Sequence, residues 1–171
     1  MEIEVLIANI ANQADIEAIV NSANANLRLG SGVAGAIHEA AGPELEKYCE
    51  PYAPLGLGKS ILTPAFDLPN KYIIHTRAAH YLFDENPEQV FQQCMDSIFE
   101  LAKDNNIRSL ALPAIGTGVF KFPAELCATT MVQSFQKHVN TPLDLVRVCV
   151  VNSSMQALFW DALDAASMSY N

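Results

Sequence analysis

Residues 18–42 read AIVNSANANLRLGSGVAGAIHEAAG, and the interpretation of the whole chain depends on this stretch. It begins inside a short apolar run, Ile16 to Val20, that is typical of a buried strand. A mostly polar segment follows, and it leads into the glycine-rich segment GSGVAG at residues 30–35. From Val33 onward the sequence has helical character until Gly42-Pro43 ends it. The stretch therefore predicts a strand, a polar loop, a glycine-rich loop and a helix, in that order.

The letters of residues 30–35 match G-x-G-x-x-G, the fingerprint of dinucleotide-binding folds. That fingerprint needs its first glycine directly after a strand, and an acidic residue at the tip of another strand about 20 residues later. Here polar residues separate the strand from Gly30, and residues 50–54 (EPYAP) are not typical of a strand. A nicotinamide-dependent oxidoreductase is therefore disfavoured. The glycines still allow the backbone to approach a bulky anion, and the following helix would offer free N–H groups to it.

A second glycine-rich segment, PAIGTGVF at residues 113–120, also joins an apolar strand to a helix. Ligands of open α/β sheets bind where the carboxyl ends of the strands converge, and loops of this kind meet there. We therefore expect the two loops to hold a diphosphate from both sides through main-chain amides. In each case the alternative is a loop that needs glycine only to turn.

Strands and helices alternate along the rest of the chain. Besides the run at 16–20, strands are expected at residues 2–8, 60–65, 71–76, 108–112 and 145–151. Further helices are expected from Asn86 as N-cap to Lys103, from Pro123, and from the segment that begins at Ser153. This order predicts an α/β fold: a three-layer α/β/α sandwich on a central mixed, largely parallel sheet, formed by one domain over residues 1–171.

Composition limits the classes of function. The net charge is −9 and Lys and Arg together number only 10, which disfavours a nucleic-acid binder because phosphate contacts supply most of the affinity of such proteins. No apolar run approaches the roughly 18 residues of a membrane span, and no secretory signal is visible. The four cysteines are too widely spaced for a metal site and are expected to be buried free thiols. We expect a cytoplasmic monomer without a metal or cofactor.

Three blocks of the sequence resemble the macrodomain family, whose members bind ADP-ribose. They are the opening stretch at 18–42, LPNKYIIHT at 68–76 and LPAIGTGVFKFP at 112–123, in the same order as in that family and at similar spacing. The resemblance spans nearly the whole chain, as far as the strand that ends at Asn152. It implies that the partner is ADP-ribose, either free or attached to a protein.

The resemblance also implies roles for individual positions. Gly30 to Gly35 would form the first phosphate loop and Ile115 to Phe120 the second. Phe120 would pack on the proximal ribose, although an ordinary core aromatic is the alternative. Asn24 would hydrogen-bond the distal ribose, although a turn residue that satisfies its own backbone is the alternative. The implied ligand-binding residues are Asn9, Ile10, Asn21, Asn24, Gly30, Ser31, Gly32, Val33, Ala34, Ile115, Gly116, Thr117, Gly118, Val119, Phe120 and Asn152.

The adenine end departs from the family pattern. Asn9 falls near an aspartate that contacts the adenine amino group in that family, with a spacing one residue longer than usual. Asn could still accept a hydrogen bond from the amino group, without contributing a charge. Ile10 is at the neighbouring position, and Asn152 stands where an aspartate often ends a strand.

A second departure concerns catalysis. Many hydrolytic relatives carry Asp where this chain has Ala34, and alanine can neither activate water nor orient a ribose. His38 lies one helical turn further on, so Asn24 and His38 are the candidate catalytic residues, although a helix-packing role is the alternative for His38. The sequence thus predicts a module that binds ADP-ribose. The competing hypothesis is an ADP-ribosyl hydrolase or O-acetyl-ADP-ribose deacetylase that works without the acid.

Overall fold

The computed structural model describes all 171 residues and contains one six-stranded sheet. The strands are β1 (Glu2–Ile7), β2 (Ala18–Ser22), β3 (Ser60–Pro64), β4 (Tyr72–Thr76), β5 (Ser109–Pro113) and β6 (Leu145–Val150). The α-helices are α1 (Gly32–Ala41), α2 (Pro43–Cys49), α3 (Pro87–Asp104), α4 (Ala124–Lys137) and α5 (Ser153–Ala165). The strand order is β1-β6-β5-β2-β4-β3, and every neighbouring pair is parallel except β3 with β4. The predicted mixed, largely parallel sheet is confirmed.

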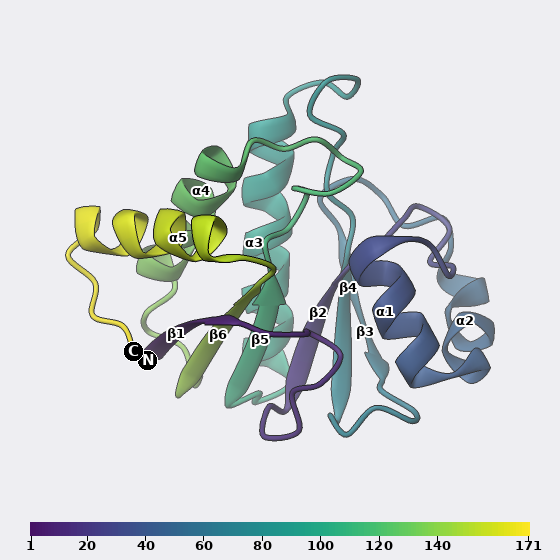
Figure 1. Cartoon of the computed structure of the whole chain (residues 1–171). Helices are drawn as coiled ribbons and strands as arrows, with labels where there is room; N and C mark the ends of the chain where they lie inside the picture. Colours follow the sequence, from purple (N-terminus) through teal and green to yellow (C-terminus); the bar gives the residue numbers. More distant parts are fainter.

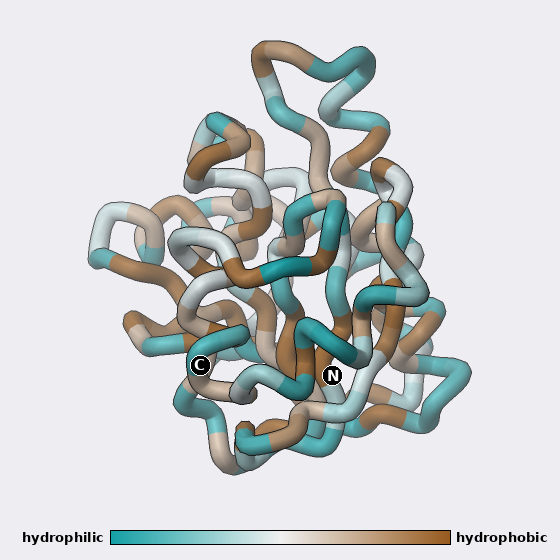
Figure 2. Tube along the Cα trace, turned by 90° about the vertical axis from the view of Figure 1, so that its right-hand side faces the viewer, coloured by the Kyte–Doolittle hydropathy of each residue, from teal (hydrophilic) through white to brown (hydrophobic).

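Helices cover both faces of this sheet, which gives three layers (Figure 1). On one face α3, α4 and α5 enclose a core cluster of 30 buried residues, and on the other α1 and α2 enclose a cluster of 15. Hydrophobic segments run through the interior of the chain trace, whereas hydrophilic segments lie mainly at its periphery (Figure 2). The four cysteines are buried and free, as predicted. No helix combines the length and the apolar character that crossing a membrane requires.

Two helix starts differ from the sequence-based expectation. Gly42-Pro43 ends α1 as predicted, but Pro43 also opens α2, because a proline is accommodated in the first turn of a helix, where its missing N–H is not needed. Asn86 precedes α3 in a left-handed conformation, with φ at 49°, and its side chain caps no amide. Asn86 therefore occupies the predicted N-cap position before Pro87, but it supplies no side-chain capping bond.

The topology determines where a ligand can bind. Strands β1, β6, β5 and β2 are adjacent and parallel, so their carboxyl ends lie along one edge of the sheet. Both glycine-rich segments emerge at this edge, one after β5 and the other, with the preceding polar loop, after β2. Such an edge is where ligands of open α/β sheets bind.

Candidate functional site

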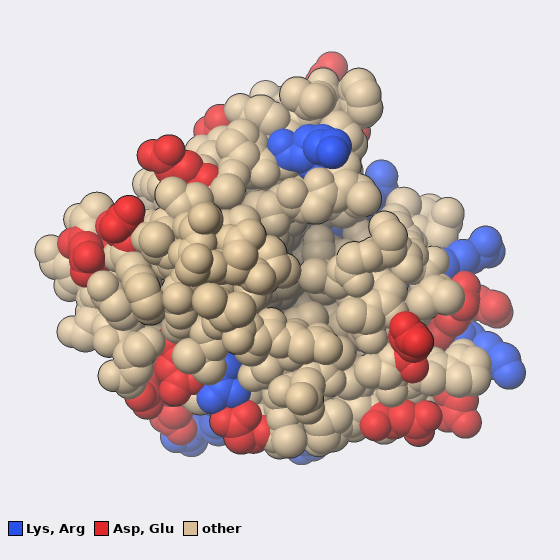
Figure 3. Space-filling model, viewed as in Figure 1, with Lys and Arg blue, Asp and Glu red and all other residues tan.

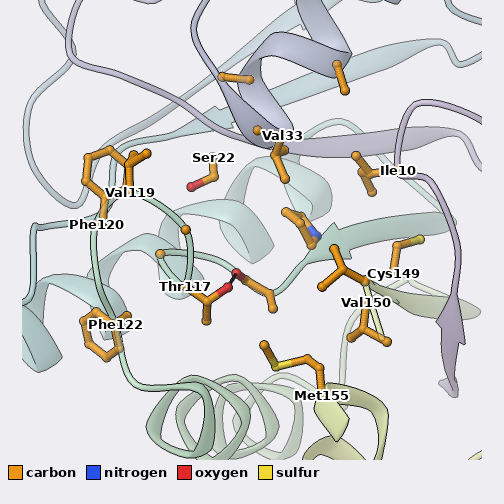
Figure 4. A pocket seen from close by; sticks show the side chains of 18 of the residues that line it. Ile10, Ser22, Val33, Thr117, Val119, Phe120, Phe122, Cys149, Val150 and Met155 are labelled. Atoms are coloured by element: carbon orange, nitrogen blue, oxygen red, sulfur yellow. Dashed lines mark hydrogen bonds between the residues drawn. The ribbon is translucent and has the colours of Figure 1, made fainter. Parts of the chain in front are cut away.

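A single large cavity of about 920 Å³ opens at this edge of the sheet. Its walls come from the carboxyl ends of four strands and from the first turns of α1 and α5, so segments distant in sequence share it. The space-filling view shows the hollow near the centre of the molecule (Figure 3). In close-up, Val33 enters from α1, Val119 and Phe120 lie at one end, and Ile10 and Cys149 lie at the opposite end (Figure 4).

The cavity is lined almost entirely by uncharged groups. None of its 23 lining residues is an Asp, Glu, Lys, Arg or His, although the chain carries a net charge of −9. Cys149 is the one lining side chain with a titratable group, and burial raises the pKa of its thiol to about 11, so the thiol stays protonated at neutral pH. Any anion in this cavity must therefore be held by neutral donors, in agreement with the acidic composition.

The first loop supplies such donors at the start of α1. Ser31 occupies the N-cap position, but its side chain accepts no hydrogen bond from the helix. The amides of Gly32, Val33 and Ala34 donate to no acceptor in the protein, and the first bond of the helix runs from the Gly35 amide to the Ser31 carbonyl at 3.3 Å. These three residues line the cavity, so the positive end of the α1 dipole is next to it.

The second loop supplies a comparable set. The Thr117 amide donates to the Ala114 carbonyl and the Phe122 amide to the Gly116 carbonyl, which folds residues 114–122 into consecutive turns. The amides of Gly118, Val119 and Phe120 lie between these turns and donate to no protein acceptor. Two sets of free N–H donors therefore belong to segments that border the same cavity.

Most of the predicted binding residues line this cavity. Those that do are Asn9, Ile10, Ser31, Gly32, Val33, Ala34, Gly116, Thr117, Gly118, Val119 and Phe120. Those that do not are Asn21, Asn24, Gly30, Ile115 and Asn152, and the candidate catalytic residue His38 also lies outside the lining. Ile115 is fully buried under its loop, and Gly30 lies against Asn24, since a Cβ at Gly30 would stand 3.2 Å from Asn24 Nδ2.

The asparagines outside the lining bond to the protein itself. Asn24 is half-buried, and its side chain donates from Nδ2 to the Arg28 carbonyl at 2.7 Å and accepts the Arg28 amide at 3.0 Å. Asn152 is the N-cap of α5 and accepts the Met155 amide at 2.9 Å. Asn21 is fully buried and donates to Nδ1 of His75 at 3.0 Å. In this structure these side chains shape the loops around the cavity.

His75 has the structural role expected for a histidine inside an apolar strand. The Thr63 hydroxyl donates to the Pro64 carbonyl and therefore accepts from Nε2 of His75 at 3.0 Å. The other ring nitrogen, Nδ1, accepts from Asn21. Burial lowers the pKa of His75 to about 3, with the nearby His38 ring as a smaller cause, so the ring is neutral.

His38 lies in the same buried region and not on the cavity wall. Its ring centroid is 6.3 Å from that of His75, and its Nε2 has no hydrogen-bond partner in the protein. Burial lowers the pKa of His38 as well. His38 lies one helical turn after Ala34 on α1, as expected, but its imidazole packs between α1 and the sheet.

Sequence reasoning missed about half of the lining residues. They are Ile7, Ala8, Ser22, Ala36, Pro113, Ala114, Phe122, Ala124, Cys149, Val150, Val151 and Met155. Many of them sit at the carboxyl end of a strand or in the first turn of a helix. The predicted ends of the strands were the available signal for these lining residues. An apolar run alone, however, does not show which strands become neighbours in the sheet.

Comparison with known proteins agrees with this geometry. The family model described as Macro domain matches residues 20–131. A Macro domain-containing protein of Ralstonia nicotianae is 38% identical over 151 residues, which cover 88% of each chain. ADP-ribose glycohydrolase MACROD2 of Xenopus laevis is 38% identical over 143 residues, which cover 81% of this chain but only 34% of that larger protein.

Solved structures are similar over almost the whole chain. An Oceanobacillus iheyensis macrodomain with ADP has a TM-score of 0.90 at 30% identity, covering 96% of this chain and 91% of that one. A Trypanosoma brucei macrodomain in complex with ADP-ribose has a TM-score of 0.85 at 26% identity, covering 95% of this chain and 69% of that one. The sequence blocks, the sheet topology and these similarities lead to one conclusion: the chain belongs to the macrodomain family.

Proposed function

We propose that this protein binds ADP-ribose, free or as a mono-ADP-ribosyl group on a protein, through its two glycine-rich loops. The observation that carries the proposal is the pair of free amide sets, Gly32–Ala34 and Gly118–Phe120, at a cavity without charged side chains. Backbone N–H groups and a helix N-terminus suit a pyrophosphate, because they supply directed donors where no cation is available. The volume of about 920 Å³ suits a ligand with a base, two riboses and two phosphates.

The remaining lining groups support an orientation for the ligand. The apolar end near Ile10, Cys149 and Val150 would hold the base, and the free amides would hold the phosphates (Figure 4). The distal ribose would then lie toward the first loop, near Asn24, and Phe120 would pack on the proximal ribose. Asn24 would contribute by holding the turn before Gly30 and, after a small adjustment, by contacting the sugar.

Calorimetry with four ligands tests the proposal. We expect ADP-ribose to bind more tightly than ADP, AMP or NAD, because it alone fills the base, phosphate and distal ribose regions with a free terminal sugar. A preference for NAD would favour a dinucleotide site, and no binding of any ligand would overturn the proposal.

The second candidate function is hydrolysis of an ADP-ribosyl ester. It is favoured by the relatives from Xenopus laevis and Homo sapiens, which are named ADP-ribose glycohydrolases. Free loop amides could stabilise charge that develops during ester cleavage. Against it, no carboxylate lines the cavity and His38 lies outside the lining, so a water would have to be activated by the ligand's own phosphate.

A labelled acceptor protein separates the two functions. The protein is incubated at high concentration with a mono-ADP-ribosylated acceptor, and release of the label is followed with time. We expect tight binding with no release above the uncatalysed rate. Release that Asn24→Ala abolishes would establish the hydrolase instead.

A further inference from the structure

The segment between β4 and α3, residues 77–86, projects beyond the rest of the chain (Figure 1, Figure 2). The base of this segment is joined to the second glycine-rich loop, because the Tyr81 amide donates to the Phe120 carbonyl at 2.8 Å. The Tyr81 ring also meets the Phe122 ring edge-on, with the centroids 5.0 Å apart. Since Phe120 and Phe122 line the cavity, the projecting segment is attached to the cavity wall.

Two large apolar side chains are exposed in this segment. Leu82 is 67% exposed and Phe83 is 82% exposed, and hydrophobic colouring reaches the outer end of the segment (Figure 2). Val119 on the neighbouring loop is 63% exposed and lines the cavity. Leu82 follows Tyr81 and Val119 precedes Phe120, so the pair Leu82 and Phe83, here called the Leu82–Phe83 patch, lies next to the rim of the cavity.

The segment is folded into a defined turn that presents the patch. The amides of Phe83 and Asp84 both donate to the His80 carbonyl, at 3.3 Å and 3.0 Å. The Asp84 carboxylate accepts the His80 amide at 2.7 Å, and the Phe83 ring stacks on the His80 ring with centroids 4.3 Å apart. The patch is thus preorganised, and a partner that covers it does not first have to order the turn.

The size and the surroundings of the patch limit what can cover it. Two side chains of this size offer roughly 300 Å² of surface, whereas a stable interface between two proteins needs about 800 Å² from each partner. A second copy of this chain is therefore disfavoured. Glu85 follows the patch at an exposed position, and its carboxylate disfavours an anionic lipid surface. A patch this small suits a partner that is already held by another contact.

A protein that carries an ADP-ribosyl group would have such a contact. The base end of the cavity lies near Ile10 and Cys149, and Val119 lies at the opposite end (Figure 4). An ADP-ribosyl group is attached to its acceptor through the ribose furthest from the base, so in the proposed orientation the acceptor leaves the cavity on the side of Val119. Side chains that flank the modified residue then meet the Leu82–Phe83 patch at a high effective concentration.

On the basis of the proposed function, we propose that the Leu82–Phe83 patch is a second contact for mono-ADP-ribosylated proteins and selects acceptors with a large apolar side chain beside the modified residue. The cavity holds the ADP-ribosyl group, and the patch covers the neighbouring side chain, which removes apolar surface of both partners from water. Free ADP-ribose has no group that reaches the patch, so its affinity is independent of Leu82 and Phe83.

Two peptides test this inference. Each carries one ADP-ribosyl group on a glutamine side chain, whose N-glycosidic bond replaces the ester and resists hydrolysis. The peptides differ only at the two residues that flank the modification, which are leucine in one peptide and serine in the other. Calorimetry measures both peptides and free ADP-ribose with the wild type, with Leu82→Ser and with the double variant Leu82→Ser/Phe83→Ser.

The variants are chosen to keep the turn. The backbone bonds to His80 are retained in both, and Leu82→Ser also keeps the stacking of Phe83 on His80. Val139→Ser is the matched control, because it removes an apolar side chain that is 44% exposed and lies outside the cavity lining. Melting temperatures confirm that each variant folds.

We expect the wild type to bind the leucine-flanked peptide about tenfold more tightly than the serine-flanked peptide, which is the effect of partly covering apolar side chains. This preference should weaken in Leu82→Ser and disappear in the double variant, whereas Val139→Ser retains it. Free ADP-ribose should bind equally well to the wild type and to every variant.

Equal affinity of the wild type for the two peptides, or a preference that persists in the double variant, overturns this inference, while binding of free ADP-ribose leaves the proposed function standing. A dimer that sedimentation detects in the wild type but not in the double variant would assign the patch to a second copy of the chain and would also overturn it. A wild type that binds neither ADP-ribose nor either peptide overturns both.

Discussion

Gly35 at the end of the first glycine-rich segment packs tightly against that segment's own backbone, whereas Gly118 in the second segment has open space around it. A Cβ atom added at Gly35 would lie 2.5 Å from the Gly30 carbonyl oxygen, a main-chain atom that cannot turn aside. A Cβ atom added at Gly118 would meet nothing within 4 Å. Glycine therefore serves two different purposes at these two positions: at Gly35 it allows the backbone to approach itself, and at Gly118 it leaves open space beside the cavity.

The largest effect is expected where the open space is filled. Gly118→Glu should weaken ADP-ribose binding by more than about 100-fold, roughly 3 kcal/mol, because a carboxylate would occupy the phosphate region and repel the ligand. The melting temperature should change little, since the added side chain meets no neighbour. Calorimetry measures the affinity, and Val139→Glu, at an exposed position outside the cavity, controls for the added charge. Unchanged affinity in Gly118→Glu would contradict the proposed site.

Replacing Gly35 or Gly118 by alanine tests the difference between these two positions. Alanine is favoured over glycine inside a helix by about 1 kcal/mol, yet at Gly35 the contact with the Gly30 carbonyl should dominate. We expect Gly35→Ala to lower the free energy of unfolding by about 2 kcal/mol and to weaken binding. Gly118→Ala should leave stability within about 0.5 kcal/mol of the wild type. Urea unfolding measures both, and equal losses in the two variants would show that the loops do not differ in this way.

Acid should lower the free energy of unfolding through two buried histidines on the side of the sheet that carries the first loop. His75 on β4 and His38 on α1 are buried, and burial lowers the pKa of both, to about 3 for His75. An unfolded histidine titrates near 6.5, so the unfolded chain binds protons that the folded chain does not. The contribution of these histidines to the free energy of unfolding should therefore be constant above about pH 7 and fall as pH drops below about 6.5, by up to about 1.4 kcal/mol per pH unit for each histidine.

Urea unfolding between pH 7.5 and 4.5 measures this slope. In His75→Gln the slope should decrease by about one proton, because the ring that must remain neutral in the fold has been removed. A stability that stays flat over this range in the wild type would show that protonation of these histidines is not linked to unfolding.

The smallest effect is expected in the turn that precedes the first loop. Asn24→Ala removes two hydrogen bonds to the backbone of Arg28 and should cost about 1 kcal/mol of stability. It should also weaken ADP-ribose binding about tenfold by releasing the turn beside Gly30. Asn26→Ala, at an exposed position in the same turn, is the control and should change neither. An Asn24→Ala variant with normal affinity would confine this residue to a structural role.

Local patterns predicted the elements of the fold well. Apolar runs located all six strands, and the three layers followed from their alternation with helices. Helix α2 was missed because Gly42-Pro43 is read as an end signal, although the same proline starts the next helix. The strand order β1-β6-β5-β2-β4-β3 depends on contacts distant in sequence, which periodicity does not contain.

The site was predictable where backbone conformation matters and less so where side chains do. Glycine spacing located both loops, because the motif itself specifies close approach of the backbone. The local sequence does not determine which partner a side-chain amide will bond. Asn21, Asn24 and Asn152 are polar enough to contact a ligand, but in this structure their side chains form hydrogen bonds within the protein. Cys149 and Met155 line the cavity only because β6 lies beside β1.

The nearly charge-free wall of the cavity has a consequence for how binding is measured. ADP-ribose carries a fully ionised diphosphate diester at neutral pH, and the one titratable lining group, the thiol of Cys149, retains its proton. Complex formation should then neither take up nor release hydrogen ions. The observed heat should be the same in Tris and in phosphate, so a titration in either buffer reports the intrinsic enthalpy directly.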